Sequence, residues 1–293
     1  CPLTSTLYLA NMYNVNTICV CGAGTMGSGI AQVAAQAGFN TIQFDVNTAM
    51  IEKSKASIEK SVQFLVEKQK ISSEEKADIF SRILFTSDIK NCVADLCIEA
   101  IIENKSAKIT LFNDLALINS QQTIFATNTS SISVGTIAED VANPAMVVGL
   151  HFFNPATIMK LVEVVQAEKT DAIVVETMVA ICKQMNKVPV ICKDAPGFIV
   201  NRVARHYYLE AMKLVELNLA TIENVDAIME ASGFKMGPFK LMDLIGMDIN
   251  FGVSHIVWEA LGKPERLTPS IVQQQKVEAG ELGRKTGKGF YKY

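Results

Sequence analysis

The feature that most constrains the fold is a glycine-rich turn between a strand pattern and a helical pattern. The run Thr17–Cys21 is rich in β-branched and apolar residues, and the segment G-A-G-T-M-G at residues 22–27 follows it directly. An alanine-rich helical stretch continues to Gly38, and a second strand pattern occupies residues 41–45. Strand, glycine turn, helix and strand in this order predict one βαβ unit, whose two strands run parallel.

The glycine turn has the G-x-G-x-x-G spacing that suits a dinucleotide. The first glycine permits the tight turn, the second lets the backbone approach a pyrophosphate, and the third lets the helix pack on the strand. Asp45 ends the next strand, where its carboxylate can accept from both ribose hydroxyls of NAD and would repel the 2′-phosphate of NADP. The alternative is that the glycines serve only turn and packing. We predict an NAD site that contains Gly22, Gly24, Thr25, Met26, Gly27 and Asp45.

The rest of the chain predicts two domains. Further strand patterns at 95–98, 123–127, 146–150, 161–165 and 188–192 alternate with helical patterns, which indicates an α/β fold with a Rossmann-type, doubly wound, mostly parallel sheet. Beyond residue 192 the patterns are helical, with helix starts expected at Thr221 and at Thr268-Pro269. We therefore predict a Rossmann domain over residues 12–193 and an all-α C-terminal domain over residues 194–293.

Composition excludes several classes of partner. The 293 residues carry a formal net charge of −3, which favours neither nucleic acid nor a membrane surface, and no run of 18 uncharged apolar residues occurs. The seven cysteines form no C-x-x-C pair and no zinc spacing, so we expect no metal and buried, reduced thiols in a cytoplasmic protein. We interpret residues 1–11 as an extension that precedes the fold.

His151 is the histidine best placed for catalysis. His206 and His255 fall in helical segments, whereas His151 directly follows the strand pattern 146–150, and open α/β sheets bind ligands at the carboxyl ends of their strands. Asn128 to Ser131 follow another strand and reach the same edge. Glu163 lies within the apolar strand 161–165, where a buried carboxylate requires a partner. From position alone the role of His151 stays open, and the alternatives for the other residues are loop polar residues that cap a helix and one acidic residue in an apolar strand.

Six motifs together resemble one enzyme family. They are GAGTMGSGIAQ, NTSSIS, GLHFFNPATIMKLVEVV, DAPGFIVNR, KMGPFKLMD and the terminal GRKTGKGFYKY. In these segments the chain resembles the 3-hydroxyacyl-CoA dehydrogenase family, and within it the bacterial 3-hydroxybutyryl-CoA dehydrogenases, over residues 15–293. The resemblance implies NAD-dependent oxidation of the 3-hydroxyl of a short L-3-hydroxyacyl-CoA to a ketone, and the reverse reduction.

The resemblance also implies residue roles. His151 would be the general base, Glu163 the acid that orients it, and Ser130 and Asn201 would hydrogen-bond the reacting oxygen. A neutral imidazole can take the hydroxyl proton, and a carboxylate on its other nitrogen stabilises the imidazolium. Further residues implied at the NAD site are Glu103, Lys108, Asn128, Ser130, Asn154 and Lys285. Residues implied at the acyl-CoA site are Ser61, Lys68, Ser130 and Asn201.

Several alternatives stay open. The pattern of lysines and glutamates around Lys68 by itself indicates a solvated helix face, and only the resemblance assigns Lys68 to the phosphates of CoA. Acyl-chain length is not fixed, so a 3-hydroxyadipyl or medium-chain substrate is an alternative, as are a dehydrogenase of free 3-hydroxy acids and a non-catalytic relative. Thr127 and Lys240 depart from the family, which more often has serine and an acid there. By resemblance the helical domain closes over the acyl chain and forms a homodimer.

Overall fold

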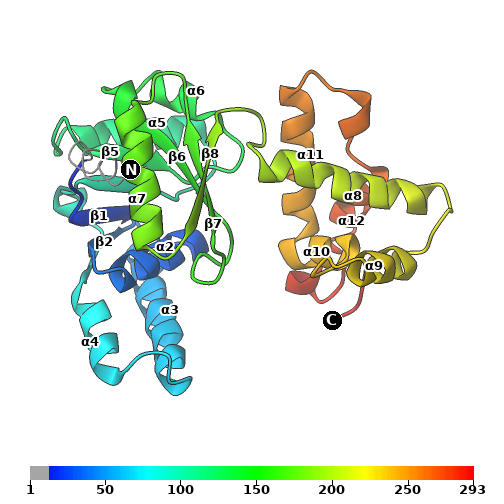
Figure 1. Ribbon diagram of the computed structural model, residues 1–293, viewed down its shortest axis with the longest axis horizontal. Helices are drawn as coiled ribbons and strands as arrows, with labels where there is room; N and C mark the ends of the chain where they lie inside the picture. Colours follow the sequence, from blue (N-terminus) through cyan, green and yellow to red (C-terminus); the bar gives the residue numbers. More distant parts are fainter. Residues whose placement is uncertain (1–12) are drawn as a thin grey trace, which may run out of the picture. The chain divides into compact units, whose positions relative to one another are not determined.

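The computed structural model describes residues 13–293 of the chain. The interpretation of residues 1–11 as an extension lies outside the described residues. The described chain divides into two compact units, the first ending at Asp194 and the second beginning at Ala195. The first unit is an α/β structure and the second is built of helices (Figure 1), so the predicted fold class is confirmed.

The first unit contains one eight-stranded sheet with the strand order β3-β2-β1-β4-β5-β6-β7-β8. Neighbouring strands are parallel except for β6 and β7, which are antiparallel, so β7 and β8 run against the other strands. The order reverses beside β1, where doubly wound sheets bind their ligands. The strands are β1 (Thr17–Cys21), β2 (Asn40–Phe44), β3 (Ile83–Thr86), β4 (Leu96–Glu99), β5 (Ile124–Thr127), β6 (Val147–Phe152), β7 (Leu161–Gln166) and β8 (Val188–Lys193).

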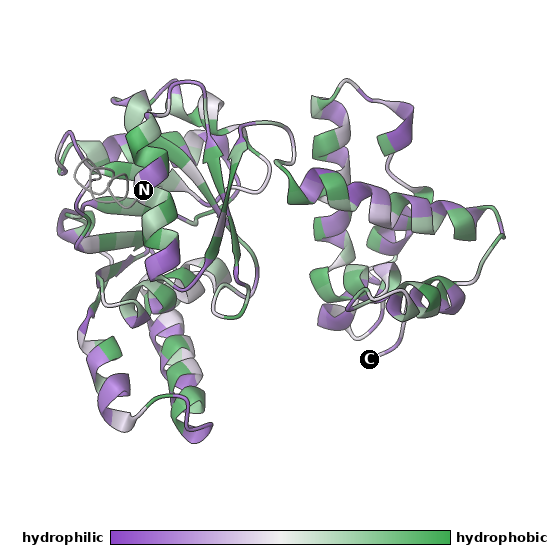
Figure 2. Ribbon diagram, viewed as in Figure 1, coloured by the Kyte–Doolittle hydropathy of each residue, from purple (hydrophilic) through white to green (hydrophobic). Residues whose placement is uncertain are grey.

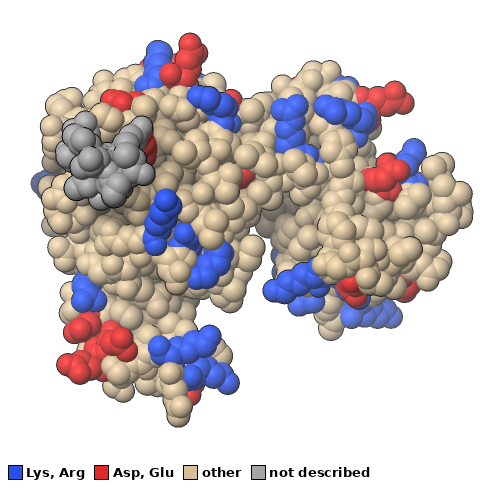
Figure 3. Space-filling view, in the orientation of Figure 1, with Lys and Arg blue, Asp and Glu red and all other residues tan. Residues whose placement is uncertain are grey.

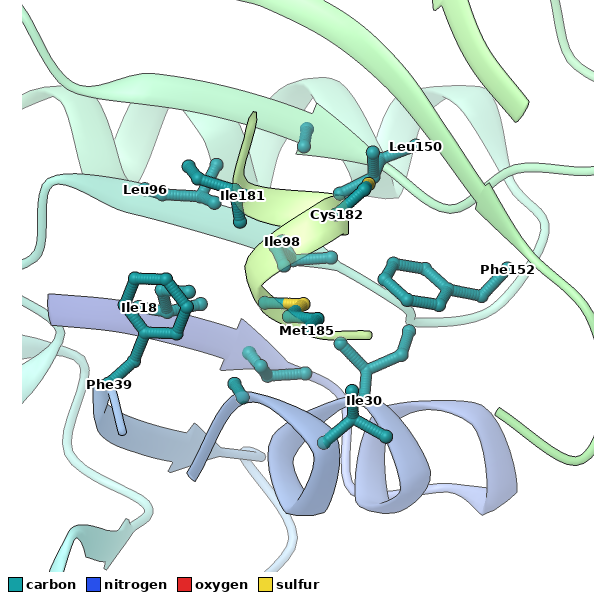
Figure 4. Packing of buried hydrophobic residues seen from close by; sticks show 14 of the residues in the cluster. Ile18, Ile30, Phe39, Leu96, Ile98, Leu150, Phe152, Ile181, Cys182 and Met185 are labelled. Carbon is teal, nitrogen blue, oxygen red and sulfur yellow. The ribbon is translucent and has the colours of Figure 1, made fainter. Parts of the chain in front are cut away.

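The hydrophobic core of the first unit lies between the sheet and its helices. Figure 4 shows Ile181 of α7 near Leu96 and Ile98 of the sheet, and all three belong to the same buried cluster as Ile30 of α2. In Figure 2 the central strands are hydrophobic along their length, as expected for strands covered on both faces. The helices of this unit are α2 (Thr25–Gln36), α3 (Thr48–Glu67), α4 (Ser73–Ser81), α5 (Lys105–Ala116), α6 (Val134–Ala138) and α7 (Ala172–Gln184).

Two features of the sheet differ from the sequence-based expectation. Strand β3 was not expected, because it is a four-residue edge strand with Leu84 exposed, and pairing with β2 defines it rather than its own pattern. Strand β6 was expected to end at Leu150 but continues to Phe152, because its pairing with β7 extends to Phe152 and Val162. His151 therefore lies inside a strand, next to its end, instead of after it.

The second unit is helical, as predicted. Helix α9 begins after Thr221, whose hydroxyl accepts from the backbone of Asn224 at 3.2 Å. The expected helix start at Thr268-Pro269 is wrong: Ser270 caps α12 and, with Gln273, completes a reciprocal capping box, which satisfies two end N–H groups at once. The helices are α8 (Val200–Glu216), α9 (Ile222–Ala231), α10 (Pro238–Ile245), α11 (Met247–Ala260) and α12 (Ile271–Glu278).

The state of the cysteines agrees with the sequence-based expectation. All six cysteines among the described residues are buried and free. Figure 3 shows basic and acidic side chains on both units, with no single sign covering the face in view. Across residues 13–293, no helix combines the length and the apolar character that crossing a bilayer requires.

Candidate active site

The glycine turn after β1 is built so that two of its glycines cannot be replaced. Gly22 has φ +103°, and a Cβ on it would lie 2.4 Å from the carbonyl oxygen of Ala100. A Cβ on Gly27 would lie 1.8 Å from the carbonyl oxygen of Gly22. Gly24 differs, because a Cβ there would meet no atom within 4 Å. Gly22 and Gly27 thus close the turn, while Gly24 borders open space.

The residues around that open space fit NAD. Gly24 is the N-terminal cap of α2 and supplies no side-chain acceptor. The first turn, which contains Thr25 and Met26, has no acidic residue. The positive end of the helix dipole is therefore not neutralised there. Asp45 lies just after β2. Its Oδ2 accepts from the backbone of Ala23 at 2.8 Å and its Oδ1 from that of Asn47 at 2.9 Å. The carboxylate is thereby fixed beside the turn, where a ribose following the pyrophosphate would lie.

His151 and Glu163 form a buried pair across β6 and β7. The two residues are direct partners in the antiparallel register, so their side chains project from the same face. Nδ1 of His151 lies 2.7 Å from Oε2 of Glu163, and the side chains are 7% and 1% exposed. The ring of Phe153 packs at 4.5 Å from the imidazole centroid. Contact with Glu163 fixes the orientation of the imidazole and favours the tautomer that carries hydrogen on Nδ1.

The loop after β5 is tied to the strand that carries His151. Oδ1 of Asn128 accepts from the backbone of Phe152 at 2.9 Å, and Phe152 directly follows His151. Ser130 lies two residues further along this loop. Ser130 and Ser131 both donate their backbone N–H groups to Oε1 of Glu103, at 3.1 and 3.2 Å. The structure therefore brings the predicted residues Asn128, Ser130 and Glu103 into one loop cluster beside the end of β6.

Lys108 is buried between two carboxylates. Its Nζ lies 2.6 Å from Oε1 of Glu99 and 3.1 Å from Oε2 of Glu103, and its side chain is 1% exposed. Burial raises the pKa of Glu103, but the charge of Lys108 and hydrogen bonds from Thr129 and Ser131 outweigh burial, so the net pKa is below its usual value. Sequence reasoning missed Glu99 and Thr129. A carboxylate in an apolar strand was the signal that singled out Glu163, and the same signal would have indicated Glu99, which ends the apolar strand β4.

The remaining predicted site residues belong to other elements of the two units. Ser61 and Lys68 belong to α3 and its end, which extends away from the sheet in Figure 1. Asn154 is exposed after β6. Asn201 and Lys285 belong to the second unit, where both carboxylate oxygens of Asp248 lie within 2.6 Å of the Lys285 amine. The roles of these five residues stay predictions.

A doubly wound sheet with this glycine turn is the fold of dinucleotide-dependent oxidoreductases. Comparison with protein-family models identifies the particular family. The model described as the NAD-binding domain of 3-hydroxyacyl-CoA dehydrogenase matches residues 17–195, and the model of its C-terminal domain matches residues 197–293. The chain belongs to the 3-hydroxyacyl-CoA dehydrogenase family. The predictions of an oxidoreductase of this family, with NAD as cofactor, are confirmed.

Individual relatives agree with this assignment. The chain is 44% identical over 282 residues to 3-hydroxyadipyl-CoA dehydrogenase of Escherichia coli, covering 96% of this chain but only 59% of that longer protein. It is 38% identical over 276 residues to a probable 3-hydroxybutyryl-CoA dehydrogenase of Deinococcus radiodurans, covering 94% and 99% of the two chains. The crystal structure of 3-hydroxybutyryl-CoA dehydrogenase from Escherichia coli matches with a TM-score of 0.93 at 44% identity, covering 96% of this chain and 60% of that one.

Proposed function

We propose that this protein catalyses the reversible oxidation of an L-3-hydroxyacyl-CoA to the 3-oxoacyl-CoA, with His151 and Glu163 as its general acid–base pair. The observation that carries the proposal is the 2.7 Å contact between these buried side chains, one residue before the end of β6. A fixed imidazole at the carboxyl edge of the sheet is the group that this chemistry requires, because the carbonyl forms only as the hydroxyl proton leaves.

The mechanism assigns a proton position to each residue. With Nδ1–H donated to Glu163, Nε2 is the basic nitrogen of the neutral ring and takes the hydroxyl proton, while Glu163 stabilises the resulting imidazolium. The glycine turn and Asp45 would hold NAD, which would supply the acceptor for the hydride of C3. The Ser130 hydroxyl and the Asn201 amide hydrogen-bond the reacting oxygen. In the reverse direction protonated His151 returns the proton, so rising pH favours oxidation and falling pH favours reduction.

Two acyl substrates have support. The short-chain 3-hydroxybutyryl-CoA agrees with the names of the Deinococcus relative and of the Escherichia coli structure. The dicarboxylic 3-hydroxyadipyl-CoA agrees with the name of the relative that is 44% identical. A kcat/KM series over acyl lengths, with 3-hydroxyadipyl-CoA included, separates them, because only a site adapted to a terminal carboxylate would prefer the adipyl compound to a neutral acyl chain of equal length.

The remaining parts of the proposal concern binding and assembly. Ser61 and Lys68 would contact the CoA moiety, and Lys68 already lies over the ring of Phe64, at 5.4 Å from its centroid. Residues 12–193 would form the NAD-binding domain, and residues 194–293 would bind substrate and form a homodimer in the cytoplasm. Lys68→Ala should raise KM for the acyl-CoA without changing kcat, and size-exclusion chromatography with light scattering tests the dimer.

His151→Gln tests the central role. Glutamine keeps a polar side chain but cannot act as a base near neutral pH, so turnover should fall by about 10²- to 10⁴-fold. NADH absorbance with acetoacetyl-CoA as substrate measures turnover, and a binding titration with NADH should be unchanged. Undiminished turnover in this variant would remove His151 from the mechanism. Equal activity with a free 3-oxo acid would instead indicate a dehydrogenase of free hydroxy acids.

A further inference from the structure

A continuous chain of charged and hydroxyl side chains runs beneath the loop that carries Ser130. It begins at Glu99, the last residue of β4, which is fully buried. Oε1 of Glu99 lies 2.6 Å from Nζ of Lys108 and accepts from the backbone of Ile101 at 2.8 Å. Oε2 accepts from the hydroxyl of Thr127 at 2.7 Å. Both carboxylate oxygens of Glu99 therefore accept hydrogen bonds, and Lys108 links Glu99 to Glu103 through its amine.

At the other end of the chain, a single oxygen of Glu103 holds the Ser130 loop. Oε1 accepts from the hydroxyl of Thr129 at 2.5 Å and from that of Ser131 at 2.8 Å, in addition to the backbone N–H groups of Ser130 and Ser131. Four donors on one acceptor leave the loop few alternative positions. Thr129 also accepts from the backbone of Ile132 at 2.9 Å, so its hydroxyl connects both sides of Ser130.

The charges explain why the chain includes all three ionisable groups. Lys108 alone would be a buried unpaired cation, which is strongly unfavourable, and Glu99 supplies its closest counter-charge. With Glu103 as the second carboxylate, the three linked side chains carry one surplus negative charge. That charge lies on the member whose side chain is 36% exposed and which receives the four donors of the loop. The surplus charge therefore faces the loop and strengthens its hydrogen bonds.

We propose that Thr129 and Glu99 are positioning residues for the reaction: Thr129 fixes the Ser130 hydroxyl through Glu103, and Glu99 fixes Glu103 through Lys108. The inference rests on the proposed role of Ser130 at the reacting oxygen. This role of Glu99 also explains why Thr127 can stand where the family more often has serine, because either residue supplies a hydroxyl that donates to Glu99. A donor to a developing charge must be held closely, and a misplacement of about 1 Å can cost about 10²-fold in rate.

A role in stability alone makes different predictions. A merely structural chain would, when weakened, lower the melting temperature or the folded fraction, but each folded molecule would turn over as before. A positioning chain, when weakened, slows the chemical step itself. The kinetic isotope effect with NADH deuterated at the transferred hydrogen should then rise, because hydride transfer becomes more fully rate-limiting. This readout does not depend on how much protein is folded.

The test compares threonine variants at two places. Thr129→Val removes the hydroxyl but keeps the shape, and should lower kcat for acetoacetyl-CoA about 10- to 100-fold and raise the isotope effect, with KM for NADH unchanged. Thr129→Ser should restore kcat to within about threefold. Thr170→Val is the matched control: Thr170 is also buried, and its hydroxyl donates to Val147 at 2.7 Å, where β6 begins. This control should keep wild-type kcat and isotope effect.

A double variant tests whether Thr129 acts through Ser130. In the background of Ser130→Ala, Thr129→Val should add less than about threefold, because the group that it positions is gone. Glu99→Gln should change kcat and the isotope effect in the same direction as Thr129→Val. If that variant does not fold, the Thr129 series decides the matter by itself.

Each result has one reading. If Ser130→Ala is impaired while Thr129→Val keeps wild-type kcat and isotope effect, the positioning role is wrong and the proposed function stands. Full additivity in the double variant leads to the same conclusion. If Ser130→Ala retains wild-type turnover, the role of Ser130 in the proposed mechanism is wrong, and the positioning role falls with it.

Discussion

Replacing Glu163 by glutamine tests the buried pair at its most sensitive point. The contact between Nδ1 of His151 and Oε2 of Glu163 is 2.7 Å, and both side chains are almost completely buried. Glutamine has the same shape and its carbonyl oxygen can still accept from Nδ1–H. The substitution therefore removes the negative charge while it keeps the hydrogen bond, and any effect reports how strongly the charge stabilises the imidazolium formed in oxidation.

The expected magnitude follows from Coulomb's law. With charge centres about 4 Å apart and an effective dielectric constant of about 20, the lost attraction is about 4 kcal/mol. Because both side chains are buried, little solvent screens this attraction. The hydrogen bond that glutamine retains recovers part of the lost stabilisation. Since about 1.4 kcal/mol corresponds to tenfold in rate, kcat should fall by roughly 10²- to 10³-fold. Stability should change little, because removing a buried carboxylate also removes its desolvation cost.

The assay follows NADH absorbance with acetoacetyl-CoA, alongside an NADH binding titration and a thermal melt. Glu168→Gln is the matched control, because Glu168 is an exposed glutamate just beyond the end of the same strand. The control should keep wild-type kcat, and both variants should bind NADH as before. Turnover of Glu163→Gln within threefold of wild type, in a folded protein, would refute the claim that the carboxylate charge supports catalysis.

Three further predictions concern the cofactor turn and acid stability. Asp45→Ala should narrow the kcat/KM preference for NAD over NADP by more than tenfold, since about 2 kcal/mol of repulsion between Asp45 and the 2′-phosphate survives solvent screening. An unaltered ratio would mean that other residues discriminate the ribose. Gly27→Ala should lower the free energy of unfolding in urea by about 2–4 kcal/mol, because its Cβ would overlap the carbonyl oxygen of Gly22. Gly24→Ala should fold normally and bind NADH more weakly. Equal free energies of unfolding for the two variants would contradict the steric difference between the two glycines. The pKa of Glu103 is lowered in the folded protein, so its contribution to stability is fully present above the usual carboxyl range and is lost as pH falls. The free energy of unfolding in urea should therefore decrease more steeply with falling pH for wild type than for Glu103→Gln. Identical slopes for the two proteins would contradict the lowered pKa.

Local sequence chemistry predicted the cofactor half of the proposed site. The glycine spacing and Asp45 are readable because their function depends on backbone freedom and on a position in one βαβ unit. The steric contacts at Gly22 and Gly27 arise within that unit and the strand beside it. The family motifs likewise indicated His151, Glu163 and Ser130, although the residues by themselves left the role of His151 open.

Helix ends and edge strands were harder to locate. Thr268-Pro269 predicted a helix start, whereas the reciprocal bonds between Ser270 and Gln273 place the cap at Ser270. Strand β3 is too short and too exposed to stand out before it pairs with β2. In both cases several local solutions have similar free energies, and contacts made elsewhere decide between them.

The sequence by itself singled out the residues of the proposed site: a glycine turn with its acid, a histidine near a strand end and a carboxylate in an apolar strand. Only the tertiary structure decided how they meet. The antiparallel reversal of β7 sets Glu163 directly opposite His151, and the burial of Lys108 joins Glu99 to the Ser130 loop. The physical reason is that pairing register and the burial of charge depend on strands and helices distant in sequence, which no local pattern encodes.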